Sequence, residues 1–254
     1  MNRRHPLIRL ILVLTWVVLA GAADGAALEE LSLTRLPEPN RFSFSYTPDA
    51  AKPAVEGILA YPDGAGPFRA VVLNHGGGGY ARTVIDHFAA IFLERKYVVA
   101  ACDLAHAGKD SKAVEDPAES LRRLDALFRI LENDDKVDAR RVFVYGNSHG
   151  AFTTVAWCTH HSRIKAAAVT GGGLFGRTQV KMDFSKISAP ILILHGAEDE
   201  IIPVSAAKRL KKALDRHGKV SQLEIVPHVG HDLPISRQKE VFAKILAFFD
   251  ENAG

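Results

Sequence analysis

The chain has 254 residues, of which 47% are hydrophobic and 24% charged, and it contains neither internal repeats nor low-complexity segments. This composition predicts a single globular domain with one large hydrophobic core, and it excludes disordered and fibrous proteins. The formal net charge is +3, but Lys and Arg form no stripe interleaved with aromatic residues, which argues against nucleic acid as a partner.

The amino-terminal segment has the pattern of a secretory signal peptide. Arg3, Arg4 and Arg9 accompany an apolar run at 10–19, and small residues follow at 20–23. The apolar run is shorter than the roughly 20 residues that span a bilayer. We therefore expect residues 1–22 to be cleaved and the protein to be exported to the periplasm or secreted, without a stable membrane anchor. The alternative is a retained anchor. The predicted domain comprises residues 23–254.

Hydrophobic patterns predict two kinds of strand along the chain. Apolar and polar residues alternate in three early segments, which predicts half-exposed antiparallel strands at 29–36, 41–46 and 55–61. Continuous apolar runs are typical of strands buried on both faces of a parallel sheet. Such runs occur at 70–73, 97–102, 142–145, 166–170, 191–194 and 223–226.

Helices are predicted between these strands at 83–95, 117–133, 151–161, 203–217 and 235–252. The second has the clearest start, because Asp116 is a good N-cap, Pro117 suits the first helical position and Glu119 completes a capping box. Strands that alternate with helices predict a doubly wound α/β sheet with an antiparallel start. In such sheets ligands bind in the loops beyond the carboxyl ends of the strands.

The chain has two cysteines, Cys102 and Cys158. An oxidising compartment would tolerate a disulfide between them, but a domain of this size does not require one. We expect two buried free thiols, because unpaired cysteine behaves as a small hydrophobic residue.

One predicted strand is followed by a sequence pattern that is typical of a nucleophilic serine. Residues 146–150 read Gly-Asn-Ser-His-Gly, directly after an apolar run. Between a strand and a helix, this Gly-x-Ser-x-Gly pattern forms a sharp turn, because glycines avoid the clashes that a Cβ would cause, and the serine hydroxyl is exposed. The pattern is short enough to occur by chance. Ser148 is therefore a candidate nucleophile only if other loops supply a base, an acid and an oxyanion site.

Four consecutive glycines, residues 76–79, follow the first buried strand. Residues without Cβ let backbone N–H groups approach a ligand closely, so Gly76 and Gly77 are candidate oxyanion donors. A flexible turn is one alternative. A phosphate-binding loop is another, but the Gly-Lys-Ser/Thr that such a loop needs is missing. The presence of Ser148 favours the oxyanion interpretation.

Two further strand-end loops contain a candidate base and three acids. A neutral imidazole can accept a serine proton near physiological pH, and we prefer His231 to His228 because His231 follows Gly230 and precedes the last helix. A metal site at the two histidines is disfavoured, because Pro227 and Gly230 would break the helix that aligns them. The acids are the Glu-Asp-Glu run at 198–200.

From about residue 55 onward the chain resembles a small α/β-hydrolase of the dienelactone-hydrolase-like and prolyl-oligopeptidase-like branch. The matching motifs are Asn74-His75-Gly76-Gly77-Gly78, residues 138–142 leading into 146–150, His195-Gly196-Ala197-Glu198-Asp199, and Gly230-His231-Asp232. The resemblance implies the α/β-hydrolase fold without a large lid domain. It also implies that Asp199, and not a neighbouring acid, orients the histidine. Dienelactone hydrolases proper carry Cys at the position of Ser148.

The resemblance implies a covalent mechanism that needs no cofactor and no metal. Ser148 attacks a carbonyl carbon, His231 transfers the proton and Asp199 fixes the imidazole tautomer. The backbone N–H of His149, with one from the glycine loop, holds the oxyanion.

Substrate selectivity depends on what covers the site. Members of this fold often carry a lid at the position of residues 171–189, but here the segment predicts at most one short helix, at 182–187. We expect an open site whose walls include Tyr80, His106, Leu174 and Phe175, and a small-molecule ester as substrate. The alternatives are a peptidase or amidase, a lactone hydrolase, and a non-catalytic secreted binding protein.

Overall fold

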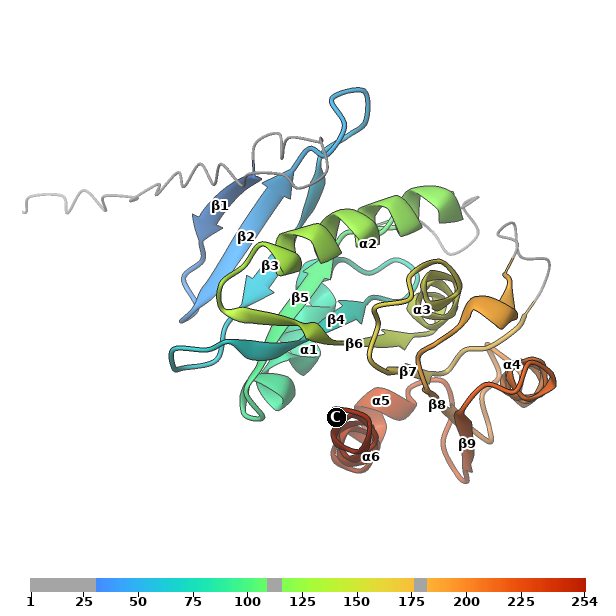
Figure 1. The fold of residues 1–254 in the computed structure, drawn as a ribbon. Helices are drawn as coiled ribbons and strands as arrows, with labels where there is room; N and C mark the ends of the chain where they lie inside the picture. Colours follow the sequence, from blue (N-terminus) through green and yellow to red (C-terminus); the bar gives the residue numbers. More distant parts are fainter. Residues whose placement is uncertain (1–30, 109–115, 176–181) are drawn as a thin grey trace, which may run out of the picture.

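The computed structural model of the chain describes residues 31–108, 116–175 and 182–254. In these ranges nine strands form one sheet, in the order β1-β2-β3-β5-β4-β6-β7-β8-β9 (Figure 1). The predicted signal peptide lies outside the described residues. Among the helices of the described ranges, none has both the length and the hydropathy needed to cross a bilayer.

The sheet begins with three antiparallel strands, as the alternating sequences predict: β1 (Leu31–Arg35), β2 (Arg41–Tyr46) and β3 (Val55–Ala60). In β2, Phe44 and Tyr46 are buried in the core, while Ser43 and Ser45 lie on the opposite face and are only half-buried. β3 pairs antiparallel with β5 (Tyr97–Cys102), which joins this part to the parallel strands.

β5 and five further strands form the parallel part of the sheet: β4 (Phe68–Asn74), β6 (Val137–Asn147), β7 (Ala167–Thr170), β8 (Ile191–Gly196) and β9 (Ser221–Val226). Most of their residues are buried, which explains the continuous apolar runs. β6 is longer than the predicted 142–145, because polar residues before the apolar run continue the strand.

Helices cover both faces of the sheet, so the predicted doubly wound architecture is confirmed (Figure 1). One face packs against α2 (Pro117–Glu132), α3 (His149–His160) and α4 (Val204–Arg216). The other face packs against α1 (Ala81–Leu93), α5 (Leu233–Ser236) and α6 (Gln238–Glu251). The predicted cap of α2 is present, since the Asp116 carboxylate accepts the Glu119 N–H at 3.1 Å.

The single helix predicted at 235–252 is wrong, because the structure contains two helices there. Arg237 separates α5 from α6 with φ −119° and ψ 30°, outside helical geometry. Leu233 on one side and Phe242 on the other are both buried in the same core cluster. The hydrophobic pattern therefore continues across the break and does not indicate it.

The prediction of two buried free thiols is confirmed. Cys102 and Cys158 are both buried and unpaired. Burial raises the pKa of each thiol to about 12, because an apolar interior disfavours the thiolate. Both therefore stay protonated near neutral pH and act as core side chains.

The described residues of the connection between β7 and β8 contain one 3₁₀ helix, Phe184–Lys186, which lies within the short helix predicted at 182–187. Residues 176–181 of this connection lie outside the described ranges.

The position of β4 determines where a ligand can approach the sheet. After β4 the chain continues to β5 on one side and then crosses to β6 on the other. The loops beyond the carboxyl ends of β4 and β6 therefore diverge and leave a crevice, the usual ligand site of such sheets. The glycine loop follows β4, and Ser148 follows β6.

Candidate active site

Ser148 occupies a strained turn between β6 and α3. Its backbone has φ 55° and ψ −118°, which non-glycine residues rarely adopt. Glycine is required on both sides: a Cβ on Gly146 would lie 2.3 Å from the Gly150 carbonyl oxygen, and one on Gly150 would lie 2.2 Å from the Asn74 carbonyl oxygen. The turn thus has the steric requirement that the sequence motif predicts.

Three loops bring Ser148, His231 and Asp199 into one hydrogen-bonded chain. Ser148 Oγ lies 2.9 Å from His231 Nε2, and His231 Nδ1 lies 2.8 Å from Asp199 Oδ2. The three residues follow β6, β9 and β8, so the parallel sheet places them at one edge. In this arrangement an imidazole can accept a hydroxyl proton while a carboxylate holds its other nitrogen.

The Asp199 carboxylate is held in one orientation by its own loop. Its side chain is fully buried, and Oδ1 accepts the backbone N–H groups of Ile201 at 3.0 Å and Ile202 at 2.8 Å. Oδ2 is thereby directed at His231. A carboxylate only accepts, so His231 Nδ1 carries the proton and Nε2 can accept one from Ser148.

The other candidates in the same two loops lie outside this chain. The His228 side chain is 86% exposed, and its nearest acid is the exposed Glu198, 3.4 Å away. Glu200 is exposed as well. Within the described ranges no cluster of three or more potential ligands could hold a metal ion.

His195 supports the loop that carries Asp199, and the sequence analysis gave it no role. It is fully buried at the end of β8, and its Nε2 donates to the Ile202 carbonyl at 2.8 Å. The same nitrogen lies 3.4 Å from Asp199 Oδ2. In the sequence, His195 lies between a predicted strand and the candidate acid Asp199, and this position could have indicated that it supports the site.

Gly171 is a second residue that the sequence analysis missed. It follows β7 with φ 56°, and a Cβ there would lie 3.3 Å from both Cε1 and Nδ1 of His231. The imidazole therefore rests on the Gly171 backbone. The preceding residue, Thr170, accepts the Ser148 N–H at 2.9 Å, so the end of β7 supports both Ser148 and His231.

The glycine loop lies beside the serine. A Cβ on Gly76 would lie 3.4 Å from the Ser148 Cβ. The Gly76 carbonyl accepts the Gly79 N–H at 3.2 Å and pairs with Nδ1 of the buried His75 at 3.0 Å. Since Leu104 N–H donates to His75 Nε2 at 3.0 Å, the His75 proton is on Nδ1 and is directed at this carbonyl. The peptide after Gly76 is thus fixed, and Gly77 is exposed at the turn.

The four predicted wall residues have different environments. His106 is buried, and its ring stacks on His149 with centroids 4.0 Å apart and planes 7° apart. Leu174 is held by α4, where its N–H donates to the Ala206 carbonyl at 3.1 Å. Tyr80 and Phe175 are each about half exposed. As substrate contacts all four remain predictions.

Similarity to known proteins covers most of the chain. A protein of Methylorubrum extorquens named "Putative carboxymethylenebutenolidase" is 28% identical over 120 residues, which is 45% of this chain and 41% of the relative. A cold-adapted esterase from an Arctic intertidal metagenomic library superposes with a TM-score of 0.70 at 19% identity, over 87% of this chain and 97% of that chain. A thermostable carboxyl esterase from Bacillus coagulans gives a TM-score of 0.69 at 15% identity, over 85% of this chain and 100% of that chain.

At these identities the two structures establish the α/β-hydrolase fold alone. The curated relative is matched over less than half of its length. Residues 55–245, however, match the family described as "Dienelactone hydrolase family", and this range contains the glycine loop and the three hydrogen-bonded side chains. The chain therefore belongs to the dienelactone hydrolase family of hydrolases.

Proposed function

We propose that the protein is a serine hydrolase that cleaves carboxylic esters. The hydrogen-bonded chain from Ser148 through His231 to the buried Asp199 carries this proposal, because it provides a nucleophile, a base and a group that fixes the base. The esterases of the same fold support ester cleavage. The signal peptide pattern at 1–22 supports export of the domain formed by residues 23–254.

The reaction proceeds in two half-reactions. Ser148 Oγ attacks the ester carbonyl carbon while His231 Nε2 takes the hydroxyl proton, and the same proton passes to the departing alcohol. This leaves an acyl group on Ser148. Water then attacks the acyl carbon, gives its proton to His231 and releases the carboxylic acid as the proton returns to Ser148. Asp199 stabilises the imidazolium in both halves.

The negative charge of each tetrahedral intermediate falls on the former carbonyl oxygen. The proposed donors are the His149 N–H, next to Ser148 in the chain, and an N–H of Gly76 or Gly77. A Cβ added at Gly76 would lie 3.4 Å from the Ser148 Cβ, so the loop runs close to the serine, and His75 holds the Gly76 carbonyl, which favours a preformed site. Loss of one such donor typically lowers the rate about 100- to 1,000-fold.

A lactone is the second candidate substrate, because it is a cyclic ester and the chain belongs to the dienelactone hydrolase family. This chain differs from dienelactone hydrolases proper in its proposed nucleophile, because it has serine where they have cysteine. An amide or peptide substrate would use the same residues. In sequence, residues 171–189 leave no room for a large lid, which favours varied ester groups over one selected partner.

Fluorophosphonate labelling tests the proposal directly. The probe phosphonylates serine only when a base activates it, so we expect one adduct, located on the peptide that contains Ser148. A panel of p-nitrophenyl esters, a lactone and a peptide p-nitroanilide then separates the three substrate classes. A folded protein that takes up no probe would exclude a serine hydrolase.

Gly171→Ala is expected to lower kcat for p-nitrophenyl acetate about tenfold. The added Cβ would lie 3.3 Å from the His231 ring, so the ring must shift by a few tenths of an ångström, whereas a misplacement of about 1 Å costs about a hundredfold. Gly218→Ala is the matched control. Gly218 has φ 62°, but its added Cβ meets nothing within 4 Å among the described residues.

Thermal unfolding and kcat should be measured for both variants. Each bears left-handed backbone strain of about 1 kcal/mol, so both should lose stability, while only Gly171→Ala should lose activity. Equal activities in the two variants would show that contact with the Gly171 backbone does not position His231.

A further inference from the structure

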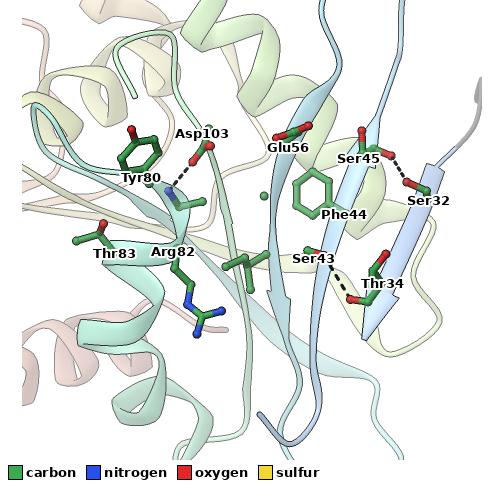
Figure 2. A pocket seen from close by; sticks show the side chains of 13 residues that line it. Ser32, Thr34, Ser43, Phe44, Ser45, Glu56, Tyr80, Arg82, Thr83 and Asp103 are labelled. Atoms are coloured by element: carbon green, nitrogen blue, oxygen red, sulfur yellow. Dashed lines mark hydrogen bonds between the residues drawn. The ribbon is translucent and has the colours of Figure 1, made fainter. Parts of the chain in front are cut away.

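A groove of about 470 Å³ lies between the first strands of the sheet and the start of α1 (Figure 2). This volume is within the range of small-molecule sites, roughly 300–1,000 Å³. The residues that give the groove its chemistry are Ser32, Ser43, Ser45, Glu56, Tyr80 and Asp103.

The groove lies where, among the described residues, a sheet face with short side chains is not covered by a helix. Ser45 pairs with Ser32 on β1 and with Glu56 on β3, and Thr34 pairs with Ser43, so small hydroxyl residues form the floor. α1 packs mainly on β3, β4 and β5 and not on this face of β1 and β2. The start of α1, with Arg82 and Thr83, lies to one side of the strands that form this floor (Figure 2).

Two hydroxyl groups of the floor, those of Ser32 and Ser43, direct their protons at the neighbouring strands. Ser32 Oγ donates to the Ser45 carbonyl and Ser43 Oγ donates to the Thr34 carbonyl, each at 3.4 Å (Figure 2). Each hydroxyl has one proton and two lone pairs. With the proton directed at the strand, the lone pairs remain for a ligand.

The charged groups of the groove also favour a ligand that donates hydrogen bonds. Glu56 and Asp103 are carboxylates on its wall, and Asp103 Oδ1 takes the Ala81 N–H at 2.7 Å. Arg82 is the cation of the groove, but its guanidinium is paired with Asp86 at 2.8 Å and with Glu38. Glu56 and Asp103 therefore disfavour phosphate or sulfate as a ligand, and an acceptor-rich surface suits neutral hydroxyl groups.

Tyr80 adds a flat aromatic surface to these acceptors. Its ring is half exposed, and a Cβ on Gly108 would lie 2.0 Å from its hydroxyl, so the ring is packed closely against that backbone. The negative face of an aromatic ring attracts the polarised C–H groups of a sugar ring. Hydroxyl acceptors, carboxylates and one exposed aromatic ring together match the donors and the C–H face of a saccharide.

The groove and Ser148 lie at the same edge of the sheet. Tyr80 follows the glycine loop after β4, and Asp103 directly follows β5. In the strand order β5 lies two positions from β6, the strand that leads to Ser148, so Asp103 is about 10 Å from that position. Ser45 on β2 lies four positions from β6, or about 19 Å. An ester whose sugar part extends from Asp103 along the groove can reach both.

We propose that this groove is a subsite for the saccharide part of an ester that is cleaved at Ser148. The part that concerns cleavage rests on the proposed function, whereas sugar binding by the groove does not. The substrate class is then an acylated, uncharged carbohydrate.

Direct binding tests the groove without catalysis. Saturation-transfer NMR with cellobiose and the full chain carrying Ser148→Ala should give sugar signals. Ser45→Phe, added to that background, fills the floor and should abolish them, whereas the matched Ser162→Phe, at an exposed turn before β7, should retain them. Glu56→Gln removes one strong acceptor and should weaken binding about tenfold even if Ser45→Phe does not fold.

The outcomes separate clearly. Absence of cellobiose signals, or equal signals with Ser45→Phe and Ser162→Phe, would overturn the proposal. So would displacement of cellobiose by butylamine at equal concentration, because the groove would then be a cation site.

A kinetic comparison links the groove to Ser148. The ratio of kcat/KM for acetylated cellobiose to that for p-nitrophenyl acetate should fall about tenfold or more in Ser45→Phe and stay constant in Ser162→Phe. An unchanged ratio in Ser45→Phe would refute the link. If neither ester is hydrolysed by the wild-type protein, the proposed function fails, while the NMR result still decides whether the groove binds sugar.

Discussion

Ser148→Ala is expected to lower kcat for p-nitrophenyl acetate about 10⁶-fold, the largest effect of any substitution in the site. The substitution removes one atom, Oγ, which is the proposed nucleophile and lies 2.9 Å from His231 Nε2. The remaining rate would come from substrate binding and the oxyanion donors alone. A net hydrogen bond is worth about 1 kcal/mol, so the free energy of unfolding should change little.

Ser162→Ala provides the control, because Ser162 is an exposed serine outside the site. Stopped-flow or endpoint assays at high enzyme concentration would measure the low residual rate, and urea unfolding would measure stability. Residual activity above about one per cent of wild type would mean that another group is the nucleophile.

Asp199→Asn should lower kcat about 10⁴-fold without unfolding the protein, for a reason specific to this loop. The backbone N–H groups of Ile201 and Ile202 both donate to Oδ1, so an asparagine must place its carbonyl oxygen there. Its NH₂ group then faces His231 Nδ1. To accept that hydrogen bond, Nδ1 must lose its proton to Nε2, and the imidazole can no longer take a proton from Ser148.

Glu198→Gln is the matched control, since it makes the same chemical change in the neighbouring residue. The Glu198 side chain is 65% exposed and pairs loosely with His228. The kcat of Glu198→Gln should stay within about twofold of wild type, because substitutions of exposed side chains usually have small effects. NMR of the His231 ring nitrogens would report the tautomer in Asp199→Asn. A proton still on Nδ1 in that variant would contradict this account.

The sequence predicted the scaffold well because its strongest signals are local. Strands buried on both faces require continuous apolar runs, and each such run became a parallel strand. Ligands bind beyond the carboxyl ends of the strands in such sheets, so the residue types in these loops indicated Ser148 and His231 as candidate nucleophile and base. The choice of Asp199 over its two neighbours came from family resemblance, and the structure adds the physical reason, since Asp199 is the buried acid of the three.

The features that the sequence did not predict depend on contacts between distant loops. Gly171 supports the His231 ring across two loops, and nothing in the run of glycines at 171–173 indicates that partner. The alternation of β2 predicted which side Ser43 and Ser45 face, but whether a helix covers that face depends on where α1 packs. Tyr80 as a wall of the site stays a prediction, and its place in the lining of the groove is indicated by no local pattern.

The turn at Ser148 has a consequence for how this protein can change over evolutionary time. Its unusual backbone is permitted by Gly146 and Gly150 and is held by the Thr170 carbonyl, none of which depends on the side chain at position 148. Serine and cysteine differ there by one atom, and their codons can be a single nucleotide apart. The backbone geometry of the turn therefore does not depend on whether residue 148 is serine or cysteine. An exchange between these two residues in evolution would change the proposed nucleophile from oxygen to sulfur without a change in the fold.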